Sequence, residues 1–194
     1  MNLLVLGPQG SGKGTQASRI AAEYGIPHVS TGDMFRAAIA AETELGRQIK
    51  PVYDSGGLVP DDVTIELIRE RLGQADATAG FVLDGFPRNL AQADALDSVL
   101  SEIGKSLDAV LFFDLADDVA LERMLGRAAQ EERSDDTPEA IARRLAIYHE
   151  HTEPVVEHYR ATGKLVPLHA ARSIGEVFGQ IQEALSLLDV GDPV

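Results

Sequence analysis

A glycine-rich segment near the start of the sequence has the residue types and spacing of a phosphate-binding loop. The apolar run Leu3–Leu6 predicts a buried strand, Gly7–Thr15 interrupts it, and a helical pattern begins at Gln16. Glycines let the backbone turn several N–H groups toward one anion, and a helix N-terminus adds the positive end of its dipole. Lys13 would add a mobile charge. A glycine-rich turn without a ligand is the alternative, but Gly-x4-Gly-Lys after a strand favours phosphate binding.

The hydroxyl of this loop departs from the common pattern. Ser or Thr usually follows the lysine directly and ligates Mg²⁺, whereas here Gly14 follows Lys13 and the hydroxyl comes one position later, on Thr15. We therefore expect a magnesium ion to be held mainly by phosphate groups and water.

A second segment with candidate functional residues follows another predicted buried strand. Phe81–Leu83 predicts that strand, and it delivers Asp84 to the carboxyl end of the sheet, where open α/β sheets bind ligands. A carboxylate there suits magnesium or a metal-bound water. Gly85 leaves room for close approach, and Pro87 stiffens the turn that carries Arg88. The alternative is that Asp84 only ends the strand and caps the next helix.

Arginines supply a third group of candidates. Arg123 and Arg127 are four positions apart on one face of a predicted helix, and Arg144 lies in the next helix. A polar loop predicted over residues 128–136 joins the two helices and contains Arg133. Together they could form a phosphate clamp, although each arginine alone is more typical of a surface salt bridge.

Five short segments predict the strands that position these residues. They are Leu3–Leu6, His28–Ser30, Phe81–Leu83, Ala109–Asp114 and Leu165–Leu168. Helical patterns alternate with them, which predicts an α/β fold with a doubly covered parallel sheet of about five strands. Pro167 favours an edge position for the last strand. Residues 40–60 are polar and punctuated by glycine, which indicates a small helical insertion.

Three helix starts matter for the site. Thr31 and Asp33 are predicted to cap one helix, and Asp61 or Asp62 to cap the helix after the insertion. Gln92 lies near the start of the helix that follows Arg88. Its side chain either faces solvent or reads the edge of a nucleobase, because an amide offers both a donor and an acceptor.

Composition restricts the classes of function. The 194-residue chain has a net charge of −14, which argues against nucleic acid or an anionic membrane as a partner. Because the chain is so acidic, a phosphate site must gather cations locally, and 13 of the 17 cations are arginine. The absence of cysteine excludes thiolate metal sites and favours the cytoplasm, and the spacing of His149 and His151 does not suit zinc. No apolar run approaches the length of a membrane span.

At this point the sequence resembles the adenylate kinases over nearly its whole length. The matching segments are Gly7–Thr15, Ser30–Met34, Asp84–Arg88, Gly126–Arg127, Arg133–Asp136 and Arg143–Leu145. The Asp-Gly-Phe-Pro-Arg run combined with the phosphate loop is specific to nucleoside monophosphate kinases. Thr31 and Gln92 favour the adenylate branch over the uridylate/cytidylate branch.

The resemblance implies a P-loop NTPase fold of three layers and reversible phosphoryl transfer from ATP to AMP, giving two ADP, with Mg²⁺. It implies one kinase domain over residues 1–194, with a core of 1–29, 60–125 and 137–194, an AMP-binding part of 30–59 and a short lid of 126–136. Many bacterial relatives carry a long lid with zinc on cysteines, but this chain resembles the short-lid type without zinc. We expect a monomer, because no long apolar stripe demands a partner.

The resemblance also implies three sets of site residues. The ATP set is Gly10, Ser11, Gly12, Lys13, Gly14, Thr15, Arg123, Arg127 and Arg172. The AMP set is Thr31, Arg36, Gly57, Leu58, Val59, Gly85, Phe86, Pro87, Arg88, Gln92, Arg133 and Arg144. The catalytic set is Lys13, Asp84, Arg88, Arg127, Arg133 and Arg144, with Asp84 holding magnesium through water. A kinase for CMP or UMP would keep nearly every motif, and a non-catalytic nucleotide-binding protein is the alternative of another class.

Overall fold

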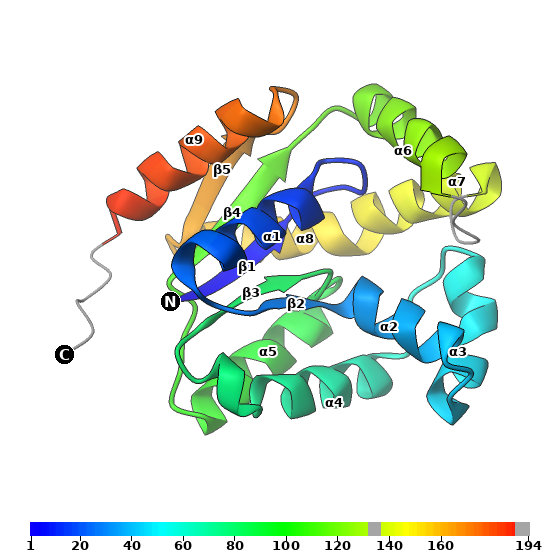
Figure 1. The fold of residues 1–194 in the computed structure, drawn as a ribbon, viewed down its shortest axis with the longest axis horizontal. Helices are drawn as coiled ribbons and strands as arrows, with labels where there is room; N and C mark the ends of the chain where they lie inside the picture. Colours follow the sequence, from blue (N-terminus) through cyan, green and yellow to red (C-terminus); the bar gives the residue numbers. More distant parts are fainter. Residues whose placement is uncertain (132–136, 189–194) are drawn as a thin grey trace.

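A five-stranded parallel sheet forms the centre of the computed structural model, which describes residues 1–131 and 137–188 (Figure 1). The strands are β1 (Asn2–Leu6), β2 (His28–Ser30), β3 (Phe81–Asp84), β4 (Ala109–Asp114) and β5 (Leu165–His169). Their order is β2-β3-β1-β4-β5, and every neighbouring pair is parallel. The predicted α/β fold and the edge position of the strand containing Pro167 are therefore confirmed.

Helices connect the parallel strands. They are α1 (Lys13–Tyr24), α2 (Thr31–Ala40), α3 (Glu44–Asp54), α4 (Asp61–Leu72), α5 (Leu90–Glu102), α6 (Asp117–Glu131), α7 (Pro138–Ile147), α8 (Glu153–Ala161) and α9 (Ile174–Ser186). A short 3₁₀ turn covers Ala75–Ala77, and a π-helical segment, η2 (Tyr148–Thr152), joins α7 to α8.

Both faces of the sheet are covered, and β1 shows how. Leu3 and Val5 pack in the cluster that contains α1 and α9, whereas Leu4 and Leu6 pack in the cluster that contains α4, α5 and α8 (Figure 1). The four side chains are at most 3% exposed. Because both faces are occupied by helices, a ligand can approach the sheet only at its edges or at the ends of its strands, as in other doubly covered parallel sheets.

Helices α2 and α3 form a small cluster of their own beside the sheet. Phe35, Ile49, Tyr53 and Val59 are buried in it. The two helices approach closely at Gly46, where a Cβ atom would lie 2.0 Å from the carbonyl oxygen of Ala38. The helical insertion predicted over residues 40–60 thus corresponds to α3 and the turn that follows it.

Helix α6 is longer than the sequence pattern indicated. The predicted polar loop over residues 128–136 is wrong at its start, since α6 continues to Glu131. Residues 128–131 are Ala-Ala-Gln-Glu, all good helix formers, and they outweigh the nearby Gly126, which is exposed. Residues 132–136, the rest of that predicted loop, lie outside the described residues.

Two of the predicted helix caps are also wrong. The N-cap of α2 is Ser30, whose hydroxyl accepts a hydrogen bond from the Asp33 amide, while Thr31 is already helical. The N-cap of α4 is Pro60, with no side-chain capping bond. The Asp61 carboxylate instead accepts hydrogen bonds from residues of α5 and the turn before it.

Candidate active site

A cavity of about 530 Å³ lies at the carboxyl ends of β1, β2 and β3. The loop between β1 and α1 lines one part of it, and the turn after β3 and the start of α2 line another. Residues of α6, α7 and η2 complete the wall. The parallel topology therefore brings together the three groups of residues that the sequence singled out.

The first wall is the phosphate-binding loop. Gly10 and Gly12 have φ angles of 82° and 86°, which only glycine adopts readily, and α1 begins directly afterwards. The Lys13 ammonium donates to the carbonyl oxygens of Gly7 at 2.6 Å and Pro8 at 2.7 Å. The side chain is therefore folded back onto its own loop, at the edge of the cavity.

The ammonium group of Lys13 is more acidic than that of an ordinary lysine. Its pKa is lowered from 10.5 to about 8: burial is the largest cause, Asp84 opposes the change, and the neighbouring Arg88 and Arg127 add to it. Burial in a low-dielectric site penalises the charged form, and like charges add to that penalty. An anion bound in the cavity would raise the pKa of the ammonium group again.

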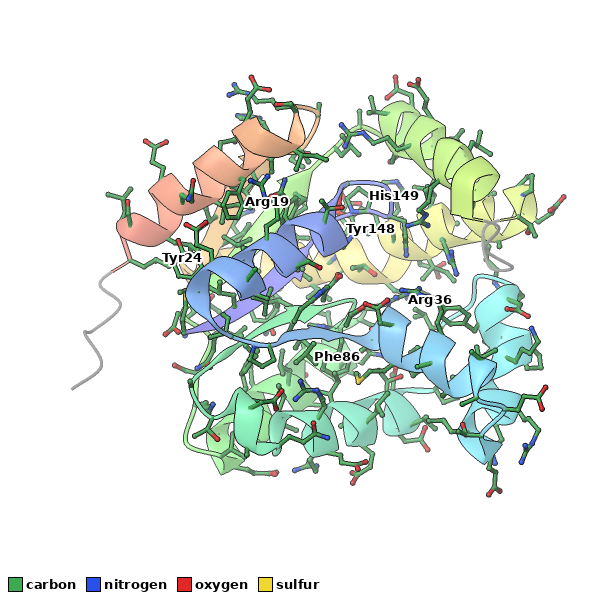
Figure 2. The ribbon with its side chains drawn as sticks, in the orientation of Figure 1. Arg19, Tyr24, Arg36, Phe86, Tyr148 and His149 are labelled. Atoms are coloured by element: carbon green, nitrogen blue, oxygen red, sulfur yellow. The ribbon has the colours of Figure 1, made fainter. Side chains whose placement is uncertain are left out.

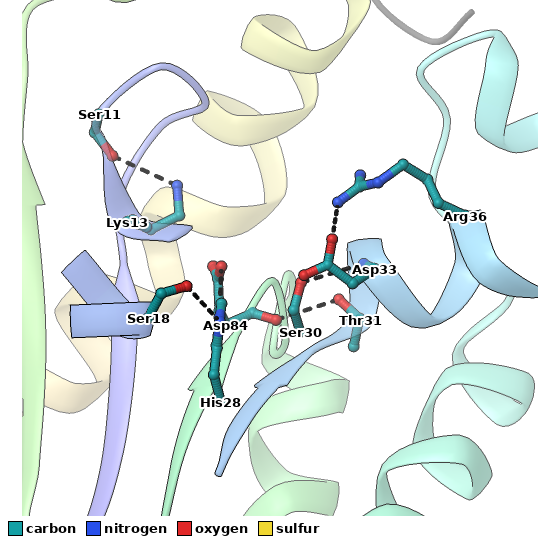
Figure 3. Close-up of polar contacts among 9 residues, drawn as sticks. All are labelled: Ser11, Lys13, Ser18, His28, Ser30, Thr31, Asp33, Arg36 and Asp84. Atoms are coloured by element: carbon teal, nitrogen blue, oxygen red, sulfur yellow. Dashed lines mark hydrogen bonds and ion pairs between the residues drawn. The ribbon is translucent and has the colours of Figure 1, made fainter. Parts of the chain in front are cut away.

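Asp84 stands beside the loop at the end of β3 (Figure 3). Its Oδ2 atom is 3.3 Å from Nε2 of His28, and the other ring nitrogen of that histidine is 3.2 Å from Ser18 Oγ. The same Oδ2 is 3.5 Å from where a Cβ of Gly14 would stand. The carboxylate thus lies next to the phosphate loop, as predicted from the sequence.

The donor set at Asp84 fits magnesium held mostly by phosphate and water. Among the described residues, no group of three or more His, Asp or Glu side chains could enclose a metal ion. Magnesium commonly uses one or two carboxylates and takes its other ligands from substrate phosphates and water. A single carboxylate facing a phosphate-binding loop meets that requirement.

Arg88 is held firmly in the turn after β3. Its Nε donates to the Gly85 carbonyl at 2.8 Å, and its own carbonyl accepts from the Thr152 hydroxyl at 2.8 Å. Burial lowers the pKa of its guanidinium group, and Arg144 lowers it further. Two neighbouring cations, Arg144 buried and Arg88 half-buried, indicate a site that suits an anion.

Arg36 faces the same cavity from α2, and Figure 2 shows it pointing toward the centre of the molecule. It forms an ion pair with Asp33 and donates to the Tyr53 hydroxyl at 2.7 Å. The Arg144 guanidinium lies 5.7 Å from the centroid of the Tyr53 ring, within the range of a cation–π contact. Tyr53 therefore lies between two arginines that were predicted to bind phosphate.

The Arg123 guanidinium, on α6, is held by three backbone carbonyls. It donates to the carbonyls of Ala170 at 3.0 Å, Ala171 at 3.3 Å and Gly10 at 3.4 Å. These contacts tie α6 to the loop after β5 and to the phosphate loop, while Arg127, one turn along α6, also lines the cavity.

Most of the predicted site residues meet in this cavity. Its lining includes Gly10, Gly12, Lys13, Gly14, Thr15, Arg36, Leu58, Asp84, Gly85, Phe86, Pro87, Arg88, Arg123, Arg127 and Arg144. A second, adjoining cavity of about 20 Å³ is lined by Gly57, Val59 and Gln92, together with Leu58, Gly85 and Arg88.

Four predicted residues are placed elsewhere or not described. Ser11 and Thr31 are buried and line neither cavity, although the Thr31 hydroxyl donates to the Asp84 carbonyl at 3.4 Å. Arg172 is exposed and lines neither cavity. Arg133 lies outside the described residues.

Sequence reasoning missed several lining residues. His28, Tyr53, Tyr148 and Thr152 line the main cavity. His28 could have been predicted to lie at the site, because it stands at the start of the predicted strand that leads into the Ser30-Thr31 segment. Tyr53 and Tyr148 gave none, because aromatic residues at helical spacing are usually core residues.

The charge balance of the cavity is opposite to that of the chain. Six cationic side chains and two carboxylates of the described residues line it, within a chain of net charge −14. Lys13, Arg123 and Arg127 gather at the loop side, and Arg36, Arg88 and Arg144 at the side of α2 and β3. One cavity can therefore hold two phosphate-bearing groups close together.

Comparison with known proteins agrees with this geometry. The family described as adenylate kinase matches residues 5–164. The chain belongs to the adenylate kinase family. Among curated adenylate kinases, those of Stenotrophomonas maltophilia (strain R551-3) and Xanthomonas campestris pv. campestris (strain 8004) are each 49% identical to it over 185 residues. Each alignment covers 95% of this chain and 99% of the relative.

The membership confirms the resemblance seen in the sequence and extends it to nearly the full length of the relatives. None of the described helices of this adenylate kinase family member is long and apolar enough to span a membrane.

Proposed function

We propose that this chain catalyses reversible transfer of the γ-phosphoryl group of ATP to AMP, giving two ADP. The observation that carries the proposal is the single cavity that joins the Lys13 loop to the Arg88 turn. One side suits the phosphates of the donor nucleotide and the other suits the phosphate of the acceptor. An enzyme of this kind maintains the balance of adenine nucleotides.

The mechanism needs positioning and charge more than a nucleophile. A phosphate oxygen of AMP is itself the attacking group, so we assign no general base. Phosphoryl transfer spreads negative charge over the equatorial oxygens of the moving group, and fixed cations stabilise that charge. Lys13 would follow the phosphoryl group, and Arg88 would hold the acceptor phosphate.

The remaining arginines would enclose the reaction. Arg36 would grip the AMP phosphate together with Arg88. Arg127, Arg144 and Arg133 would approach the transferred group from the lid side, and Arg123 would lie along the ATP base. Closing residues 126–136 over the site would exclude water, which otherwise competes as the acceptor.

The tethers of Lys13 and Arg36 support these roles. Both side chains are bonded to protein oxygens at the cavity: Lys13 to loop carbonyls, and Arg36 to Asp33 and Tyr53. These bonds keep each cation near the place where a phosphate would arrive. The exchange of one oxygen acceptor for another then requires little movement.

Magnesium would be held at Asp84 through water and by the nucleotide phosphates, and when bound it would neutralise charge on the phosphoryl oxygens. The AMP base would lie near Gln92, with Thr31, Gly57, Leu58, Val59, Phe86 and Pro87 around the nucleotide. The backbone of Arg172 would contact the ATP base. We place the enzyme in the cytoplasm, where its substrates are, and expect it to act as a monomer without nucleic acid.

A panel of acceptor nucleotides tests the function. With ATP as the donor, a coupled assay should show AMP as the best acceptor among AMP, CMP, UMP and GMP. The purified enzyme should also convert ADP alone into ATP and AMP. A higher kcat/KM with CMP or UMP would contradict the adenylate assignment, and binding of ATP without turnover of any acceptor would contradict the assignment as an enzyme.

A further inference from the structure

The side-chain amide of Gln92 is buried and bonded at both ends. Gln92 is 2% exposed, near the start of α5. Its Oε1 accepts a hydrogen bond from the backbone N–H of Arg88 at 2.7 Å, and its Nε2 donates to Asp61 Oδ1 at 2.6 Å. The two partners come from different parts of the chain, the turn after β3 and the first turn of α4.

These two partners fix which way the amide points. A backbone N–H can only donate, and an ionised carboxylate can only accept. A rotation of the amide by half a turn would set Nε2 against the Arg88 N–H and Oε1 against the Asp61 carboxylate. Both contacts would then be repulsive, so one orientation is strongly preferred.

Asp61 is itself held in place. Asn89 Nδ2 lies 3.0 and 3.2 Å from the two carboxylate oxygens of Asp61. Asn89 is also the N-cap of α5, because its Oδ1 accepts from the Gln92 backbone N–H at 2.8 Å. The carboxylate is thus fixed to the helix that carries the amide.

The locked amide keeps one donor and one acceptor for a ligand. Nε2 has two hydrogens and uses one on Asp61, and Oε1 has two lone pairs and uses one on the Arg88 N–H. Gln92 also lines the small second cavity with Phe35, Tyr53 and Val59. At about 20 Å³ this cavity has room for roughly one water molecule, so its walls must part to admit a base.

We propose that Asp61 is a positioning residue that sets the base specificity of the acceptor site through Gln92. The edge of adenine presents an acceptor at N1 and a donor at its 6-amino group, which pair with the remaining Nε2 hydrogen and Oε1 lone pair. Hypoxanthine has nearly the same shape but presents a donor at N1 and an acceptor at O6. It would need the reversed amide, which Asp61 and the Arg88 N–H oppose.

This inference rests on the proposed function, because it takes Gln92 to face the base of the acceptor nucleotide. The two can fail separately. Failure of the wild-type enzyme to phosphorylate AMP would remove the proposed function. A wild-type enzyme that prefers AMP, combined with a specificity that does not depend on Asp61, would remove only the role of Asp61.

The experiment compares kcat/KM for AMP and IMP at saturating ATP in the wild-type enzyme and in Asp61→Asn. Asparagine keeps the shape of the side chain but can either donate or accept, so it tolerates both orientations of the Gln92 amide. The ratio of kcat/KM for AMP to that for IMP should fall at least about tenfold, since hydrogen bonds to charged groups are the stronger ones. Asn89→Ser should retain the α5 cap, release Asp61 and lower the ratio to a smaller extent.

Asp62→Asn is the matched control. It removes the same charge from the same first turn of α4, but Asp62 is exposed, and its AMP to IMP ratio should equal that of the wild type. A purely structural role of Asp61 predicts a lower melting temperature and an equal loss of kcat/KM for both nucleotides. That outcome, with the ratio unchanged in Asp61→Asn and Asn89→Ser, would overturn the proposal.

Discussion

Individual cationic residues of the site are tethered to protein oxygens. Lys13 bonds to loop carbonyls, Arg88 to the Gly85 carbonyl, and Arg36 to Asp33 and Tyr53. Such tethers reduce the conformational entropy that binding must remove from long side chains. Burial lowers the pKa values of Lys13 and Arg88, and the neighbouring cations lower them further.

The pKa of Lys13 predicts how activity depends on pH. Only the protonated ammonium can stabilise the phosphoryl group, and burial brings its pKa to about 8 in the free enzyme. Since kcat/KM reports the free enzyme, kcat/KM for ATP should decline as pH rises through about 8, rather than near the ordinary lysine value. Steady-state kinetics across this range would measure it.

Two variants isolate Lys13 in this profile. Lys13→Arg stays charged across the range, so whatever activity it retains should not decline near pH 8. Lys13→Met should fold and lose about 10²- to 10³-fold in kcat, the usual cost of removing one electrostatic group from a transition state. A decline near pH 8 that persists in Lys13→Arg would assign the titration to another group.

At the scale of elements, the α2–α3 pair has little tolerance for added volume. The carbonyl of Ala38 would lie 2.0 Å from a Cβ at Gly46, and this contact is backbone, which cannot rotate away. The pair also presents Arg36 and Tyr53 to the cavity. Packing at Gly46 and geometry at the acceptor side are therefore coupled.

Two glycine variants test this close approach. Gly46→Ala should lower the free energy of unfolding by about 1–3 kcal/mol, because overpacking forces the helices apart. Gly126→Ala is the matched control, since Gly126 is an exposed residue within α6 and nothing lies within 4 Å of its added Cβ. It should raise the free energy of unfolding by about 0.5–1 kcal/mol through helix propensity. Urea denaturation measures both, and a neutral Gly46→Ala would contradict the close packing.

At the scale of the whole molecule, an acidic chain surrounds a cationic cavity. The chain carries a net charge of −14, whereas the cavity gathers six cationic side chains of the described residues. Like charges spread over a folded protein repel one another and favour expansion, and salt screens that repulsion. The net charge therefore costs stability at low ionic strength.

Salt should accordingly stabilise this protein. Raising NaCl from about 20 to 200 mM should raise the melting temperature by about 2–4 °C, as expected for a gain of about 1 kcal/mol in a chain of this size. Chloride bound in the cavity would have the same effect, so the series is repeated with saturating ATP. A rise that persists with ATP comes from screening, and a melting temperature that falls with salt in both series would contradict the argument.

The five strands and the main site segments could be predicted because their signals are local. Buried strands such as Phe81–Leu83 read as short apolar runs, and the glycine loop with its lysine is nine consecutive residues, Gly7–Thr15. The α/β alternation then leaves few topologies, and these place Asp84 and Lys13 at the same end of one sheet.

Side-chain partners far apart in the sequence could not be predicted in this way. Asp61 lies at a helix start, where a capping role is the usual interpretation, yet its carboxylate bonds to Gln92, 31 positions away. Likewise, Tyr53 was indistinguishable from a core aromatic until folding placed its hydroxyl on Arg36. Local patterns determined the phosphate loop, the acidic strand end and the α/β fold. Only the tertiary structure decided which oxygen or nitrogen atom each buried polar group meets, because packing of separate helices creates those contacts.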